Sequence, residues 1–307
     1  RAAQLVKSAI DNEETIRIVG DYDIDGINSI YILYSGLKRL GADVDYVVPH
    51  RVTDGYGINE RLIDEAYDEG RQVIITCDNG IAAYNQVKYA KENGLTVIVT
   101  DHHDVPFDEV NGVKEYRVPP ADAVVNPKQE DCQYPFRLLC GAGVAYKLIS
   151  LIYERLRLDT KDMEEYREFM AIATVGDIVD LIDENRVVVK YGLKHIAHTV
   201  NTGLKALVEE CGVDINNISS YHIGFVIGPC LNASGRLDTA RKAIELMLCK
   251  NTEEAHNMAR ELITLNTERK QMTADETAKA IELVEKNDML KDRVLVIYLP
   301  DCHESIA

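Results

Sequence analysis

Acidic residues and two adjacent histidines follow several β-branched runs of the chain, a pattern that predicts a divalent-metal site. In an open parallel α/β sheet the carboxyl ends of the strands share one edge, so acids dozens of residues apart can converge there. Carboxylates and an imidazole suit manganese or magnesium better than zinc or a softer metal. The clusters are Asp21-Tyr22-Asp23-Ile24-Asp25, Asp78, Asp101-His102-His103 and Asp177, and the runs preceding the first three span residues 16–19, 73–76 and 97–100.

The first acidic cluster, flanked by Gly20 and Gly26, also invites comparison with the opening of a calcium-binding loop. That loop requires Glu at its twelfth position, where this chain has Ile32, and a helix before it, where this chain has a strand-like run. A plain acidic turn is the other alternative. The other clusters, at residues 78, 101–103 and 177, favour a metal site over a calcium loop and over a plain acidic turn.

The two histidines and Asp177 predict different contributions to such a site. Alternate residues of an extended stretch face opposite ways, so one imidazole can bind metal while its neighbour turns toward a substrate. Asp177 is embedded in apolar residues, and a buried carboxylate needs a cation or several hydrogen bonds to remain ionised. Asp180 could take this role instead, and the spacing does not decide between the two.

The composition predicts a soluble, cytoplasmic protein with no membrane partner. The formal net charge of −17 argues against a basic surface for duplex binding, yet a metal site and a few arginines can hold one strand. The seven cysteines include no Cys-x-x-Cys pair, which argues against a zinc ribbon or a disulfide framework. No apolar stretch approaches the roughly 20 residues of a membrane span. Residue 1 is not Met and a strand-like segment stops at residue 307, so we expect both ends to be cut from a longer polypeptide.

The order of the predicted elements indicates an α/β fold with a doubly wound parallel sheet. Up to about residue 127, strands alternate with helices predicted at 27–40, 60–68 and 82–92, and Gly41, Gly70 and Gly94 stand where helices end. Beyond Asn126-Pro127 an added helical region is predicted at residues 141–155, 163–174, 186–198 and 204–211.

The last third of the chain predicts a functional loop, a long helix and the start of another domain. Residues 215–237 read as an irregular loop holding Ser234-Gly235-Arg236, and residues 239–249 as a helix. Residues 252–286 lack Gly and Pro and can form a connector helix of up to about 50 Å. Residues 293–299 are β-rich. The predicted division is a catalytic domain at 1–200, a helical region at 201–250, the connector helix at 251–287 and the start of a further domain at 288–307.

These motifs resemble the DHH phosphoesterase superfamily and, within it, the RecJ single-strand-specific 5′-exonucleases. The resemblance spans nearly the whole chain, and residues 303–307 resemble the start of a DHHA1 domain, most of which is missing. The matching motifs are residues 20–26 and 51–57, Cys77-Asp78-Asn79-Gly80, Thr100-Asp101-His102-His103, Cys140-Gly141-Ala142-Gly143, Val175-Gly176-Asp177 and Asn232-Ala233-Ser234-Gly235-Arg236.

The resemblance implies roles for individual residues. His103 would lie beside the scissile phosphate as a catalytic group, while Asp21 and Asp101 would support the ligands from behind. Arg51, Ser234 and Arg236 would contact phosphates at the strand end, while Arg51 by itself is equally well interpreted as a solvated arginine. The resemblance implies that one or two manganese or magnesium ions are held by Asp23, Asp25, Asp78, His102 and Asp177. Asp78 would also be a catalytic residue.

The function that the resemblance implies is 5′-to-3′ hydrolysis of single-stranded DNA to 5′-mononucleotides, in DNA repair and recombination. A helicase and a single-strand-binding protein are its implied partners. A manganese pyrophosphatase is disfavoured because that family has His where this chain has Val19. A phosphodiesterase for short oligonucleotides or cyclic dinucleotides and an inactive replication scaffold remain the alternatives.

Overall fold

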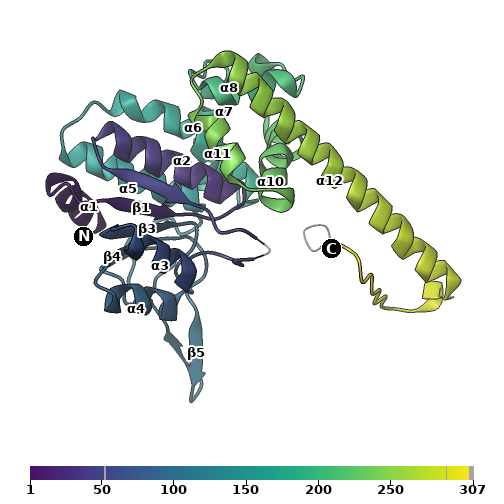
Figure 1. Cartoon of the computed structure of the whole chain (residues 1–307), viewed down its shortest axis with the longest axis horizontal. Coiled ribbons are helices and arrows are strands. Elements are labelled where there is room, and N and C mark those ends of the chain that lie inside the picture. The colour runs from purple at the N-terminus through teal and green to yellow at the C-terminus, as the bar shows by residue number, and fades with distance from the viewer. Residues whose placement is uncertain (52, 288, 304–307) are drawn as a thin grey trace.

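A five-stranded parallel sheet lies at the centre of the computed structural model, which describes residues 1–51, 53–287 and 289–303 (Figure 1). The strand order is β2-β1-β3-β4-β7, so the predicted parallel α/β sheet is confirmed. Every residue of β1 and β3 is buried, because helices cover both faces of the sheet. The strands are β1 Ile16–Val19, β2 Val44–Val47, β3 Val73–Cys77, β4 Thr96–Thr100 and β7 Ala123–Val125.

The strand order reverses at β1, which pairs with β2 on one side and with β3 on the other. The register pairs Val19 with Thr76, Cys77 with Thr100, and Thr100 with Val125, so the carboxyl ends of four strands are level. Ligands of open α/β sheets bind in the crevice beyond such ends, at the point of reversal. The acidic clusters follow β1, β3 and β4 directly, and they therefore meet at this crevice.

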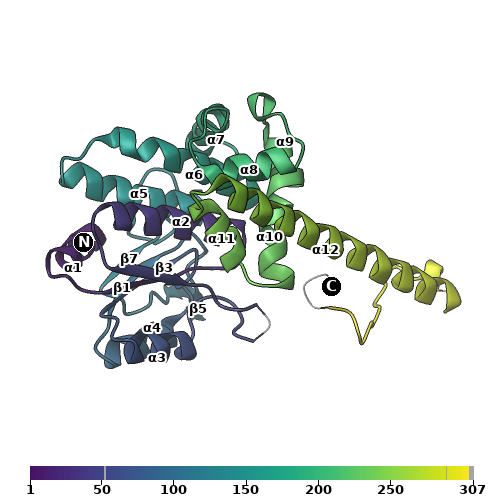
Figure 2. The same cartoon turned by 45° about the horizontal axis from the view of Figure 1, so that its top comes forward.

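Two hydrophobic layers hold the helices against the sheet. One face, with Val19, Ile74 and Val97, packs against α3 (Glu60–Asp68) and α4 (Tyr84–Glu92). The opposite face packs against the helices on the other side of the sheet (Figure 2). Those helices are α1 Ala2–Asp11, α2 Ile24–Arg39, α5 Gly141–Arg155 and α6 Glu164–Gly176.

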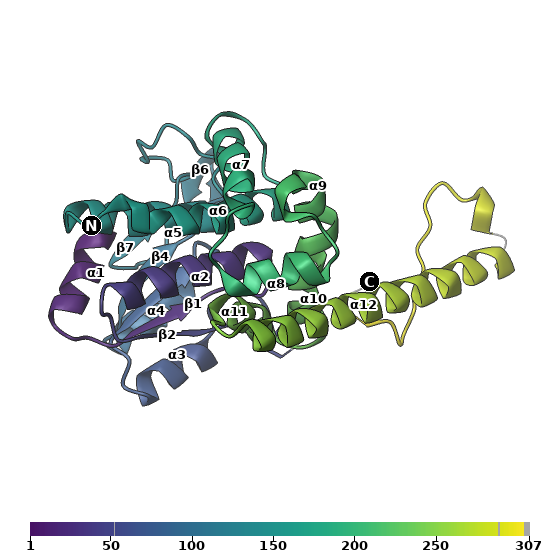
Figure 3. The same ribbon diagram turned by 90° about the horizontal axis from the view of Figure 1, so that it is seen from above.

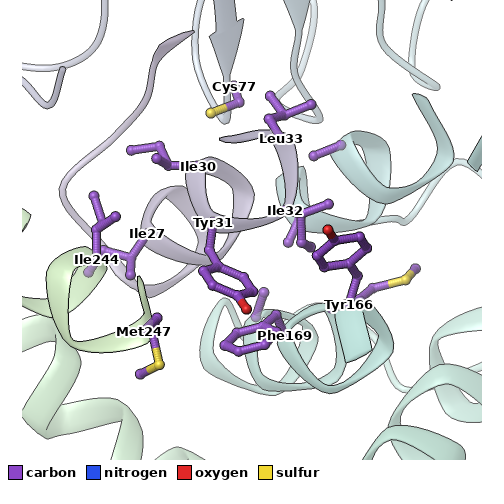
Figure 4. Packing of buried hydrophobic residues seen from close by; sticks show 14 of the residues in the cluster. Ile27, Ile30, Tyr31, Ile32, Leu33, Cys77, Tyr166, Phe169, Ile244 and Met247 are labelled. Carbon is purple, nitrogen blue, oxygen red and sulfur yellow. The ribbon is translucent and has the colours of Figure 1, made fainter. Parts of the chain in front are cut away.

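The larger core is centred on α2. Tyr31 stacks on Phe169 with ring centroids 4.0 Å apart, and Tyr166 meets it edge-on at 6.2 Å (Figure 4). The buried Asn201 amide donates to the Tyr31 hydroxyl at 2.9 Å and to the carbonyl of Met247 at 2.8 Å. These contacts join α2 and α6 to α8 (Thr202–Glu210) and α11 (Arg241–Leu248) in one core.

The predicted helix ends at Gly41, Gly70 and Gly94 are confirmed. Each glycine has a positive φ, between +73° and +84°, which residues with a side chain rarely adopt. In each case the glycine amide bonds back to a carbonyl of the preceding turn.

The predicted connector helix forms α12 (Thr252–Lys286), capped by the Asn251 side chain, which accepts the amide of Glu254. Its first half packs on α8 and on α10 (Gly228–Leu237), whereas its second half projects away from the sheet domain (Figure 3). Helix α7 (Asp183–Ile196) completes the predicted helical region. No helix among the described residues is both long enough and apolar enough to cross a membrane.

The predicted irregular loop at 215–237 is wrong, because this stretch is mostly helical. Pro229 stands in the first turn of α10, where a missing amide proton costs nothing. Gly235 lies inside α10, and a Cβ there would lie 2.1 Å from the Tyr22 carbonyl oxygen. The missing side chain at Gly235 therefore allows α10 to pack against Tyr22, and it does not serve the approach of a ligand. The elements here are the 3-10 turn η2 Ile215–Asn217, α9 Ser220–His222, the π-turn η3 Ile223–Ile227 and α10.

The β-rich run at 293–299 forms no strand, so that expectation is also wrong. Val294, Val296 and Tyr298 are at least 75% exposed, and no neighbouring strand among the described residues offers a ladder. Of the predicted DHHA1 start at 303–307, residues 304–307 lie outside the described residues. A hairpin of β5 (Phe107–Val110) and β6 (Val113–Tyr116) was not predicted. The remaining short turns are η1 Thr160–Met163 and η4 Met289–Lys291.

Candidate metal centre

The crevice at the carboxyl edge of the sheet gathers carboxylates around one imidazole. His102 Nε2 lies 3.1 Å from Asp78 Oδ1, 3.5 Å from Asp25 Oδ2 and 3.7 Å from Asp177 Oδ2. These residues come from the ends of β4, β3, β1 and α6, respectively. Asp180 is exposed and belongs to none of the metal-sized groups found among the described residues, so the structure brings Asp177 to His102 instead.

A second group of carboxylates lies beside the first. Potential ligand atoms of Asp21, Asp23 and Asp78 all lie within 4.8 Å of one another, as do those of Asp25, His102 and Asp177. Asp78 also forms such a group with His102 and His103. Asp78 therefore stands between the groups, where one carboxylate can bridge two cations.

Local sequence fixes the two aspartates after β1. Asp23 caps α2, and its Oδ1 accepts the amides of Asp25 at 2.9 Å and Gly26 at 3.0 Å. Asp25 is fully buried and accepts the amides of Gly141 at 2.6 Å and Ala142 at 2.8 Å. The amino end of α5 therefore holds one carboxylate of the site.

The glycine of the Cys140-Gly141-Ala142-Gly143 motif permits this close packing. A Cβ at Gly141 would lie 2.8 Å from Asp78 Oδ1. From sequence, this motif had no assigned role. Small residues at the start of a predicted helix are the signal that could have identified an amide-lined site.

Asp101 holds His103 from behind. Its Oδ1 accepts the amides of His102 at 2.7 Å and His103 at 3.1 Å and lies 2.8 Å from His103 Nδ1, while Oδ2 accepts the Ile81 amide at 2.9 Å. Burial would raise the pKa of Asp101, but the hydrogen bonds from His103 and Ile81 outweigh it and lower that pKa. The same bond raises the pKa of His103, which favours a charged imidazole at the rim.

The electrostatics of the crevice favour a bound cation. Burial, followed by repulsion from neighbouring carboxylates, raises the pKa of Asp177 to about 7 and that of Asp21 to about 8. Burial also raises the pKa of Asp78, whereas it lowers the pKa of His102 and so favours the neutral, metal-binding imidazole. Among the described residues, Asp21 Oδ1, Asp78 Oδ1 and His102 Nε2 are buried without a hydrogen-bond partner.

These residues fit the implied metal. Hard carboxylate oxygens with a single imidazole suit manganese or magnesium, and no thiolate joins the metal-sized groups found among the described residues. A divalent cation would satisfy the unpartnered atoms of Asp78 and His102, which belong to one group, and reduce the repulsion between the carboxylates.

Two arginines line the cleft that opens from these carboxylates. The cleft has a volume of about 440 Å³ and is bordered by Asp23, Asp177, Arg51 and Arg236. The Arg51 guanidinium lies 5.3 Å from the centre of the Tyr22 ring. Burial, followed by the nearby Arg51 and Arg269, lowers the pKa of Arg236. An anion in the cleft would relieve that repulsion.

The structure corrects the expectation for Ser234. Its side chain is fully buried in α10, and its hydroxyl donates to the carbonyl of Leu231 at 2.8 Å. This serine therefore does not face the cleft, whereas Asn232 of the same motif does. The physical reason is the helix, which turns residues 232, 234 and 236 in different directions.

Comparisons with known proteins identify the family. The model of the DHH family, N-terminal domain, matches residues 15–174. The chain is 39% identical over 295 residues to the single-stranded-DNA-specific exonuclease RecJ of Bacillus subtilis, covering 96% of this chain and 36% of that protein. It is 34% identical over 321 residues to the same enzyme of Escherichia coli, covering 100% of this chain and 54% of that protein.

A solved structure of exonuclease RecJ bound to manganese matches with a TM-score of 0.85 at 33% identity, covering 99% of this chain and 74% of that one. The chain therefore belongs to the DHH family and, within it, to the RecJ group. It spans 36% and 54% of the length of the two curated relatives.

Proposed function

We propose that this protein hydrolyses single-stranded DNA from the 5′ end and releases 5′-mononucleotides in DNA repair and recombination. The observation that carries the proposal is a dense carboxylate–histidine group that opens into a cleft bordered by two arginines. The RecJ relatives are single-stranded-DNA-specific exonucleases, and the family resemblance extends over the whole described site.

We infer that Asp23, Asp25, Asp78, His102 and Asp177 hold one or two manganese or magnesium ions. Such ions, when bound, lower the pKa of a coordinated water and stabilise negative charge on the phosphate. Backbone amides hold the carboxylates of Asp23 and Asp25 in their orientation, so these two ligands are positioned by the fold. Asp21 lies beside Asp23 and Asp78, from where it supports the same group.

His103 is the proposed proton donor of the reaction. Its ring lies 4.4 Å from that of His102, and its bond to Asp101 favours the charged imidazole. A charged His103 at the rim of the cleft can hold a proton for the departing oxygen or a non-bridging oxygen of the scissile phosphate.

Arg51 and Arg236 are the proposed binding site for phosphates at the strand end. Guanidinium groups present a planar fork of donors that matches phosphate oxygens. A site that fixes one end of the strand near the hydrolytic group would impose exonucleolytic polarity. The net charge of −17 leaves little attraction for a duplex outside this cleft.

The wider setting follows from the same proposal. We infer a cytoplasmic protein with reduced thiols, consistent with seven free cysteines, that cooperates with a helicase and a single-strand-binding protein. We also propose the division into a catalytic domain at 1–200, a helical region at 201–250, a connector helix at 251–287 and the start of a further domain at 288–307.

The test is manganese-dependent digestion of a 5′-phosphorylated single strand labelled at its 3′ end, beside a duplex, a dinucleotide and pyrophosphate. Release of mononucleotides from the 5′ end of the long single strand alone is the expected result. Preferred hydrolysis of the dinucleotide or of pyrophosphate would instead assign the protein to another activity of the superfamily. Absence of turnover on every substrate would indicate a scaffold.

A further inference from the structure

Asn79 links the metal edge of the sheet to the segment that carries Arg51 and Tyr56. We infer that it is a positioning residue, which sets Asp78 for metal binding and Arg51 for recognition of a terminal phosphate at the same time. The inference rests on the proposed function, which it deepens by naming what couples hydrolysis to the strand end.

The Asn79 side chain joins three separate parts of the chain. It is fully buried, and its Nδ2 donates to the carbonyls of Val19 at 3.1 Å and Cys77 at 2.9 Å. Its Oδ1 accepts the amide of Ile58 at 3.1 Å. One amide group therefore connects the end of β1, the end of β3 and the segment that precedes α3. The two donor bonds and the one acceptor bond require a side chain with both functions.

The segment before α3 also rests directly on the turn after β3. The Tyr56 hydroxyl donates to the backbone carbonyl of Asp78 at 2.7 Å, two residues before the Ile58 bond. A Cβ at Gly57, whose φ is +70°, would lie 3.0 Å from Asn79 Cβ. Residues 56–58 therefore pack directly on Asp78 and Asn79, with no space for a side chain at residue 57.

The turn around Asn79 directs the Asp78 carboxylate. Asp78 has a φ of +60°, in the left-handed region that side chains other than those of Asn and Asp rarely adopt. The Thr76 hydroxyl donates to the Asn79 carbonyl at 2.8 Å and closes the turn. In this conformation Asp78 Oδ1 lies 3.1 Å from His102 Nε2. Loss of the Asn79 amide would remove one of the restraints on a strained backbone.

An independent set of contacts anchors the other end of the segment. Asp54 accepts the amide of His50 at 2.8 Å and two bonds from Arg61, at 2.9 and 2.6 Å. Arg51 lies inside the turn that the His50–Asp54 bond closes, and the Asn79–Ile58 bond holds the same segment four residues beyond Asp54. A change at Asn79 therefore leaves the Asp54 anchor in place and loosens the attachment of the whole turn to the metal edge.

The discriminating experiment is a double-mutant cycle between Asn79→Ala and Arg51→Ala. The quantity measured is the ratio of kcat/KM for a 5′-phosphorylated single strand to that for the same strand with a 5′-hydroxyl, in manganese. We expect each single variant to lower this ratio about tenfold, and the double variant to lower it hardly further, because both act through one contact. A residue with a merely structural role would lower both kcat/KM values equally and leave the ratio unchanged.

Asn59→Ala is the matched control. Asn59 is in the same segment but caps α3, where its side chain accepts the amide of Leu62 at 3.0 Å. Loss of this cap should lower the melting temperature of the protein, and we expect the ratio to stay at the wild-type value. Gly57→Ala perturbs the same contact from the segment side, should Asn79→Ala fail to fold, and we expect it also to lower the ratio.

The outcomes separate the inference from the proposed function. A wild-type ratio in Asn79→Ala or, if that variant does not fold, in Gly57→Ala would overturn the inference alone. The inference would also be overturned if the two reductions in the ratio, from Asn79→Ala and from Arg51→Ala, multiplied in the double variant. A wild-type protein that hydrolyses neither strand in manganese would overturn the proposed function and the inference with it.

Discussion

The amino and carboxyl ends of the same strands carry charged residues in two opposite arrangements. Near the amino ends, Arg17 is buried, donates two bonds to Asp45 at 3.0 and 2.6 Å, and donates one to Glu69 at 2.6 Å. At the carboxyl ends, Asp78 and His102 are also buried, but Asp78 Oδ1 and His102 Nε2 lack hydrogen-bond partners among the described residues. Paired charges stabilise the sheet, whereas the unpaired ones make a site that a cation can complete.

The largest effect should come from removing one charge at the carboxyl edge. We expect Asp78→Asn to lower manganese-dependent hydrolysis by at least about 1,000-fold, because it removes the carboxylate shared by the ligand groups. Asn tolerates the positive φ of this position, so the fold and the melting temperature should be retained. Steady-state kinetics with circular dichroism would check both, and unchanged activity would contradict the metal assignment.

Manganese should stabilise the folded protein, and more so at high pH. The pKa values of Asp177, about 7, and Asp21, about 8, lie above their usual 3.8, so the folded state binds more protons than the unfolded state. Without metal, stability therefore falls as the pH rises from about 4 to about 8. A metal at 100 times its Kd adds about 2.7 kcal/mol and holds the carboxylates ionised.

Thermal unfolding at pH 6 and pH 8.5, with and without manganese, measures this effect. The shift in melting temperature caused by manganese should be larger at pH 8.5. An equal shift at both pH values would mean that these carboxylates do not bind the ion.

The paired charges of the sheet should respond in the opposite way. Arg17→Met should destabilise the fold by about 2 kcal/mol, since Asp45 and Glu69 lose their buried partner but keep Arg71 and remain partly solvated. Activity per folded molecule and the manganese-induced shift should stay at wild-type values. Denaturant titration beside the nuclease assay would check this, and a selective loss of activity would mean that the two arrangements are coupled.

Glu168 sharpens the comparison because it is a buried carboxylate away from the site, with one oxygen, Oε2, that lacks a hydrogen-bond partner among the described residues. Burial raises its pKa to about 7 from 4.5, so its contribution to stability is present below pH 4.5 and is lost as the pH rises through 7. Glu168→Gln should stabilise the protein by about 2 kcal/mol at pH 8 and little at pH 4.5. Melting curves at both pH values test this, and the manganese-induced shift should not change.

The strands and the gathering of the acids followed from sequence, for a physical reason. A β-branched run that ends in an acid is most stable as a buried parallel strand with a polar end. The carboxyl ends of such strands share one edge of the sheet, which brings Asp25, Asp78 and His102 together. The exact spans of α3, α5 and α12 also followed, since helical spacing and caps are local signals.

The failures concern positions that tertiary contacts decide. The glycines and the proline of residues 215–237 indicated a loop, yet Gly235 is required where α10 approaches Tyr22, a contact that no local pattern reveals. Ser234 was assigned to the cleft from the family resemblance, whereas its position inside α10 turns its hydroxyl to the Leu231 carbonyl. The apolar run at 293–299 had the composition of a strand but no partner among the described residues. Asn79 was quoted within a motif, while its bonds to Val19 and Ile58 depend on the assembled fold.

The most direct test of the metal centre is a crystal structure of this protein grown with manganese, with anomalous diffraction recorded at the manganese edge. We expect one or two anomalous peaks beside the Asp78 carboxylate, with His102 and Asp177 among the remaining ligands. Absence of any peak in this crevice, or manganese bound only elsewhere on the protein, would contradict the proposed metal centre.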